Sequence, residues 1–151
     1  MGAKIEQADR LGSTLRQGRS RRKIFDGGIV QRQLAAMRLV RGKIDAAEAT
    51  ARTAVEISRF DDLWDALGPI QHLATVAALR GRPHTAARLL GFVNAKMSEV
   101  QRIRTHFHCA GHDILVASLR KQLSADAIEK LVAEGAALDL DRAVDEALNL
   151  G

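Results

Sequence analysis

Apolar and polar positions along this chain follow the three-to-four-residue spacing of amphipathic helices, and the arrangement repeats after 39 residues. Val40-Arg41-Gly42 recurs as Leu79-Arg80-Gly81, and Leu34-Ala35 recurs as Leu73-Ala74. A fixed period in the range of about 20–50 residues is typical of stacked repeats that bury their apolar faces on one another. The pattern therefore predicts an all-α protein built from stacked, antiparallel helix pairs.

Each repeat is predicted to hold two helices joined by a glycine turn. In the first repeat the helices cover residues 29–41 and 44–58, with Gly42 between them. In the second repeat Gly81 occupies the equivalent place, where a left-handed backbone is needed, and Pro83 opens the following helix. The two repeats share one plan, so we expect Gly42 and Gly81 to lie in equivalent turns.

The repeat pattern is incomplete at both ends of the chain. Ile5, Ala8, Leu11 and Leu15 predict the second helix of a pair without the first helix that should precede it. After residue 98 the period is lost, and shorter helices are expected. We therefore divide the chain into an N-terminal half-repeat helix with a basic junction, two 39-residue helical repeats and C-terminal capping helices, at residues 1–23, 24–98 and 99–151.

The C-terminal capping helices carry start and stop signals. Ser124 is a good N-cap, and Leu123 and Ile128 flank it at the positions of a hydrophobic staple. We expect this helix to stop at Gly135, because glycine is favoured just after a helix end. Asp139 is expected to cap the last helix.

The amino-acid composition favours packed layers of helices and indicates the cellular compartment of the protein. Of the 151 residues, 46% are hydrophobic but only 3% aromatic, which favours close packing of small side chains over a β-sandwich. Cys109 is the only cysteine, so no intramolecular disulfide can form and a reducing compartment is expected. No apolar run approaches the roughly 18 residues of a membrane span, and no signal peptide is visible, so we expect a cytoplasmic protein.

Positive charge is concentrated near the N-terminus. The net charge is +5, yet residues 1–43 hold 11 Lys/Arg against 3 Asp/Glu, whereas residues 44–151 hold 12 against 15. An arginine-rich run can bind nucleic acid by neutralising phosphates. One alternative function is therefore a small basic nucleic-acid-binding protein that uses residues 16–43, with contacts from Arg19, Arg21, Arg22 and Lys23. No aromatic residues interleave with these cations for base stacking, so a solvated junction between helices is the simpler interpretation.

One cluster contains residue types that bind metals. On a helix, His108 and His112 lie four residues apart on one face with Cys109 beside them, and imidazole and thiolate are suitable zinc ligands. A fourth ligand is not evident, and Gly111 weakens the helix that would align the three. A metal site at residues 106–112 is a second alternative, and incidental histidines at a helix start are the simpler interpretation. No catalytic residue and no cofactor are predicted, because Cys109 has no identifiable orienting group or oxyanion donor.

One spacing of leucine, alanine and glycine occurs twice in the chain. The first copy is Leu34-Ala35, Gly42 and Ala47, and the second is Leu73-Ala74, Gly81 and Ala86. It resembles the tetratricopeptide repeat, and a period of about 40 residues is closer to the helical-repeat region of bacterial LuxR-type transcriptional regulators and related signal-transduction ATPases. Residues 84–91 and 131–148 resemble the C-terminal end of those proteins. The resemblance implies a tetratricopeptide-like α-solenoid fragment with a C-terminal helical cap that serves as a sensor or scaffold. The phosphate-binding motif G-x4-G-K-[ST] of an ATPase module does not occur in this chain.

These patterns together predict a non-enzymatic helical-repeat module for protein–protein interaction in signal transduction or transcription regulation. The partner, a protein or a peptide, is expected on a concave face formed by the first helix of each repeat. The predicted partner-binding residues are Gln31, Gln33, Arg38, Gln71 and His72. The uncovered apolar stripe of the N-terminal helix also predicts a homodimer, or a partner that supplies the missing helix. Neither nucleic acid nor a membrane is the expected partner.

Overall fold

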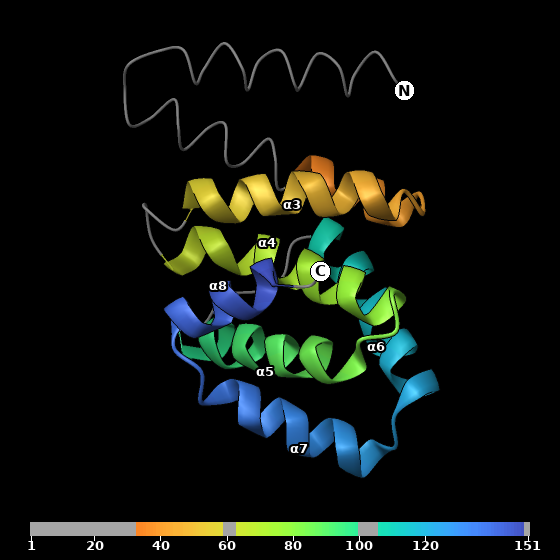
Figure 1. Cartoon of the computed structure of the whole chain (residues 1–151), viewed down its shortest axis with the longest axis vertical. Helices are drawn as coiled ribbons and strands as arrows, with labels where there is room; N and C mark the ends of the chain where they lie inside the picture. Colours follow the sequence, from red (N-terminus) through yellow and green to blue (C-terminus); the bar gives the residue numbers. More distant parts are fainter. Residues whose placement is uncertain (1–32, 59–62, 100–105, 150–151) are drawn as a thin grey trace.

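The computed structural model describes residues 33–58, 63–99 and 106–149, without the side chains of residues 63–65 and 106–108. Every regular element in these ranges is an α-helix, and antiparallel helices pack against one another, so the predicted all-α class is confirmed (Figure 1). The N-terminal half-repeat helix and the basic run lie outside the described residues. Residues 33–40 are helical and are followed by α3 (Ile44–Ser58), α4 (Leu63–Leu79), α5 (Pro83–Glu99), α6 (His106–Gln122), α7 (Ala125–Ala136) and α8 (Leu140–Leu148).

Gly42 and Gly81 end their helices with the same backbone arrangement. Their φ angles are 74° and 77°, in the left-handed region that glycine adopts without steric cost. In each turn the glycine amide donates to the carbonyl three residues earlier, and the next amide donates to the carbonyl five residues earlier, at 2.8–3.2 Å. This pair of bonds is the Schellman motif, which satisfies the last carbonyls of a helix. The prediction of equivalent glycine turns is therefore confirmed.

Buried alanines let successive helices approach closely. Ala47 on α3 and Ala86 on α5 occupy equivalent places in the sequence, and both are fully buried. α3 packs on α4, and α4 packs on α5. α4 is the central helix of this layer, and its residues from Ala66 to Ala78 are all buried.

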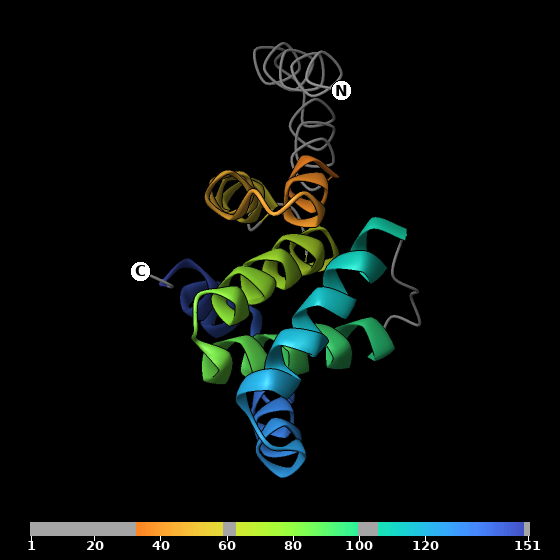
Figure 2. The same ribbon diagram turned by 90° about the vertical axis from the view of Figure 1, so that its right-hand side faces the viewer.

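α6 and α7 extend this arrangement, because α6 lies against α4 and α7 lies against α5. α8 and α6 flank the α4–α5 layer on opposite sides (Figure 2). The two predicted N-caps are confirmed. Ser124 accepts a hydrogen bond from the third amide of α7 at 3.2 Å, and Asp139 accepts one from the third amide of α8 at 2.8 Å. No helix in the described part of the chain is both long and apolar enough to cross a membrane.

Gly135 does not end α7, so that prediction is wrong. The helix continues to Ala136, and Gly135 is not among the described glycines with positive φ. A β-carbon at Gly135 would lie 1.7 Å from the carbonyl oxygen of Arg88, and one at Gly91 would lie 2.0 Å from that of Val132. Both glycines are needed because the backbones of α5 and α7 touch where the helices cross. This crossing positions α7, and with it the corner between α6 and α7.

Candidate functional site

The face that was predicted to receive a partner is covered by the chain itself. Gln71 and His72 on α4 are both 0% exposed, so their predicted place on an open concave face is wrong. A β-carbon built on Gly111 of α6 would lie 3.8 Å from Gln71 Nε2 and 3.9 Å from His72 Nδ1. The Thr75 hydroxyl is within hydrogen-bonding distance of the Gly111 carbonyl oxygen, at 3.3 Å. α6 therefore packs on this stripe of α4, and a partner could reach it only by displacing α6.

The other predicted partner residues have different environments. Gln33 is exposed, and Gln31 lies outside the described residues. Arg38 is half-buried, and its guanidinium donates to the hydroxyl of Thr50 on α3. Thr50 in turn donates to the carbonyl of Ala46 at 2.8 Å. Arg38 thus ties α3 to the helix before it, and partner binding by Gln31 and Gln33 stays a prediction.

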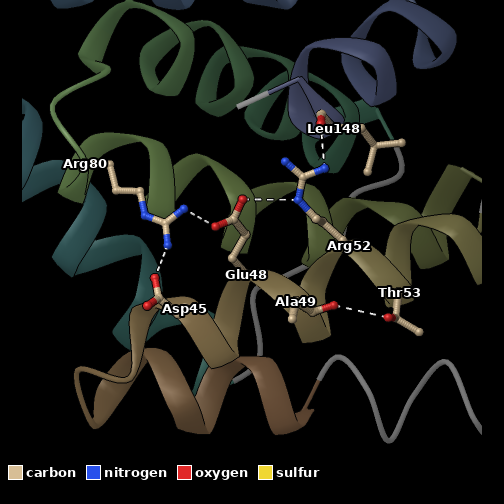
Figure 3. Close-up of polar contacts among 7 residues, drawn as sticks. All are labelled: Asp45, Glu48, Ala49, Arg52, Thr53, Arg80 and Leu148. Atoms are coloured by element: carbon tan, nitrogen blue, oxygen red, sulfur yellow. Dashed lines mark hydrogen bonds and ion pairs between the residues drawn. The ribbon is translucent and has the colours of Figure 1, made fainter. Parts of the chain in front are cut away.

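An ion-pair network joins α3, the end of α4 and α8 (Figure 3). Glu48 lies between two arginines, and its carboxylate pairs with Arg80 and, at 3.1 Å, with Arg52. Arg80 also pairs with Asp45, and Arg52 donates to the carbonyl of Leu148 at 2.6 Å. Two cations and two anions thus compensate one another within the chain. We interpret the network as a structural link between helices, because it leaves no net charge for a ligand.

Arg88 makes a second link, from α5 to α7 and α8. Its guanidinium donates to Glu146 at 2.7 Å and to Glu134 at 3.3 Å. Hydrogen bonding to Glu146, aided by the charges of both carboxylates, raises the pKa of Arg88 above its ordinary value. Arg88, which is charged at neutral pH like any arginine, thus links α5 to α7 and α8 through these two ion pairs.

The candidate metal ligands are only partly described. Cys109 is exposed near the start of α6, and His112 Nδ1 lies 3.7 Å from the Asp113 carboxylate. Among the described residues, no three His, Cys, Asp or Glu side chains are grouped to hold a metal ion. The side chain of His108 lies outside them, so a metal site that includes it stays a prediction. Nucleic-acid binding also stays a prediction, because the description does not reach Arg19, Arg21, Arg22 and Lys23.

An open groove lies at the corner where α6 leads into α7. Its volume is about 500 Å³, within the roughly 300–1,000 Å³ that ligand sites in proteins usually occupy. None of its lining residues belongs to the predicted partner-binding set. The groove is lined by Arg120, Leu123, Ala125, Ile128, Glu129 and Val132.

The apolar floor of the groove is held in place from several sides. Leu123 and Ile128 occupy the two staple positions around the Ser124 cap, as the sequence predicts. Val132 follows one turn after Ile128, and its backbone meets Gly91 of α5. Leu123, Ile128 and Val132 are half-buried and pack against the core. The floor is therefore preorganised by a helix cap, by core packing and by the α5–α7 crossing.

The groove also contains two exposed charges of opposite sign. Arg120 belongs to the last turn of α6, and Glu129 lies on α7. Within the described part of the chain, neither side chain forms an ion pair or a hydrogen bond, either with the other or with a third residue. The groove thus offers an apolar floor together with a cation and an anion that a ligand can engage.

Comparison with protein families, with curated proteins and with solved structures finds no match for this chain. The resemblance to the helical-repeat region of LuxR-type regulators therefore stays a prediction from residue spacing. The α6–α7 groove is the candidate functional site because of its geometry and its two charges.

Proposed function

We propose that this chain is a non-enzymatic protein–protein interaction module whose binding surface is the α6–α7 groove. The observation that carries the proposal is an open, preorganised apolar groove of about 500 Å³ with two exposed charges. A partner that covers Leu123, Ile128 and Val132 removes apolar surface from water, which is the main driving force of association. The exposed charges add orientation and selectivity more than affinity.

The lining of the groove suits binding better than catalysis. Its charged side chains are Arg120 and Glu129, and its other lining residues are aliphatic. A nucleophilic or acid–base site needs a reactive group that a second group activates or orients. Neither Arg120 nor Glu129 has such a neighbour within the described residues. A binding role is therefore the function that this chemistry favours.

The helical stack supports the same proposal. The two glycine turns have the same backbone hydrogen bonds, and the stack continues beyond α4 and α5 because α6 lies on α4 and α7 lies on α5. We infer a tetratricopeptide-like α-solenoid fragment that α8 closes on one side. Such stacks present extended surfaces to partners. The resemblance of residues 84–91 and 131–148 to LuxR-type regulators favours a regulatory role in signal transduction or transcription.

A photo-crosslinking residue placed at Ala125 tests this proposal in the native cell. Ala125 is exposed and lines the groove, whereas Ala133 is exposed on the same helix outside it. We expect one dominant protein to be captured at Ala125 and not at Ala133. That protein, once purified, should bind the full chain and should lose binding to Ala125→Trp but not to Ala133→Trp. Equal capture at both positions, or binding that survives Ala125→Trp, contradicts the proposal.

A further inference from the structure

We propose that the groove binds an amphipathic helix of a protein partner, with aliphatic side chains on the floor, an acidic side chain at Arg120 and a basic side chain at Glu129. This inference rests on the proposed function and adds the chemistry of the ligand. It uses three features of the groove: the helices that form it, the spacing of its floor and the sign of its two charges.

A helix is the form of partner that this site accommodates. Extended peptides are often bound by adding a strand to an exposed sheet edge, and the described ranges contain no strand. A helix binds in a hydrophobic groove through apolar anchors that recur every three or four residues. Ile128 and Val132 lie four residues apart on α7 and form a row along the floor. Aliphatic residues at the same spacing on the partner match this row.

The two charges of the groove determine which side chains of the partner should flank its apolar anchors. Arg120 and Glu129 line the same groove from different helices and do not pair with each other, although their charges are opposite. By contrast, Glu134, two residues after the last lining residue Val132 on α7, is already paired with Arg88. A partner with an acid at Arg120 and a base at Glu129 gains two attractions. A partner with the reverse order meets a like charge at both places, and such juxtapositions select against it.

The first part of the test uses the full chain and a random-sequence peptide library displayed on phage. Peptides are selected on the unchanged protein and depleted on Ala125→Trp, in which a large side chain fills the groove. We expect the enriched peptides to carry aliphatic residues three or four positions apart, with an acid on one flank and a base on the other. A parallel selection on the double variant Arg120→Glu/Glu129→Arg should keep the aliphatic spacing and exchange the two charges.

The second part is a double-mutant cycle on one selected peptide. Arg120→Glu should weaken binding about two- to fivefold, the range of an exposed ion pair. Replacing the peptide's acidic residue by lysine should restore the affinity for that variant, because the cycle isolates the pairwise contact. Lys121→Glu is the matched control, since it reverses the neighbouring exposed charge outside the groove and should leave the affinity unchanged.

The outcomes separate this inference from the proposed function. Groove-dependent peptides with the same charge order on both proteins would overturn the inference and leave the proposed function standing. The absence of any groove-dependent peptide, together with no captured protein at Ala125, would overturn both. A dimer in sedimentation that Ala125→Trp converts to a monomer would identify a second copy of the chain as the occupant, which would also overturn the inference.

Discussion

Replacing Gly135 by alanine tests the α5–α7 crossing on which the groove depends. The new β-carbon would start 1.7 Å from the carbonyl oxygen of Arg88 and 2.5 Å from its carbonyl carbon. Both atoms belong to backbone, which cannot rotate away as a flexible side chain can. Because an ordinary contact begins at 3.4 Å, the distance must grow by about 1.7 Å before the clash is relieved. α7 would have to move away from α5.

The cost of this movement follows from two opposing effects. Overpacking of a tightly packed interior costs about 1–3 kcal/mol, and a backbone clash belongs at the upper end of that range. Alanine regains about 1 kcal/mol over glycine from its higher helix propensity. The net loss of stability is therefore about 2 kcal/mol. For a chain of 151 residues, this lowers the midpoint of thermal unfolding by roughly 4–8 °C.

Thermal melts followed by circular dichroism give the comparison. Gly111→Ala is the matched control, because its β-carbon would also lie within a helix but would meet nothing closer than 3.8 Å. It should raise the midpoint by roughly 2–4 °C through helix propensity alone. Gly91→Ala should behave like Gly135→Ala. If Gly135→Ala melts as high as Gly111→Ala, the close crossing is absent, and the reason to regard the groove floor as preorganised is lost.

Five further substitutions, of three kinds, test the rest of the fold. Leucine at Ala47 or at Ala86 should overpack equivalent helix contacts and cost about 1–3 kcal/mol in urea unfolding; an unchanged midpoint would refute the equivalence. Alanine at Gly42 or at Gly81 should cost about 1–2 kcal/mol in the same assay, because φ is 74° and 77° there; stability retained by either variant would count against its left-handed turn. Glu48→Gln removes the carboxylate that pairs with two arginines and should cost about 1 kcal/mol. That loss should shrink as salt is added, and a loss independent of salt would contradict an electrostatic origin.

The ends of several helices could be predicted because local chemistry decides them. Only glycine adopts the left-handed backbone conformation after a helix at almost no energetic cost. Gly42 and Gly81 could therefore be predicted as turns from the sequence. Ser124 and Asp139 carry short side chains that accept from the first amides of a helix, and the structure places both as caps. These signals need no knowledge of distant parts of the chain.

The predictions for Gly135, Gln71 and His72 were wrong because a distant element of the fold decides the role of each residue. Glycine serves either a left-handed turn or a close backbone approach, and only the position of α5 shows that Gly135 serves the second. Helical periodicity places Gln71 and His72 on α4 but does not show which helix covers them. Their burial depends on α6, which begins more than thirty residues later in the chain.

The groove was only partly predictable for the same reason. The Ser124 cap and the staple positions of Leu123 and Ile128 were visible in the sequence and form part of its floor. Its shape also depends on how α7 sits on α5, which the spacing of residues does not reveal. Nothing in the spacing of Arg120 and Glu129 along the chain distinguishes them from ordinary surface charges, because their common groove is a property of the folded corner.

Methyl NMR of the full chain during titration with a selected peptide is the most direct test of binding at the groove. Leucine, isoleucine and valine methyl groups report on the groove and also on Val40 and Leu79, the exposed large hydrophobic residues in the described part of the chain. We expect the largest shifts at Leu123, Ile128 and Val132, and none at Val40 and Leu79, which are 54% and 38% exposed beside the two glycine turns. Shifts centred on Val40 and Leu79, with the groove methyls unmoved, would contradict the assignment of the α6–α7 groove as the binding surface.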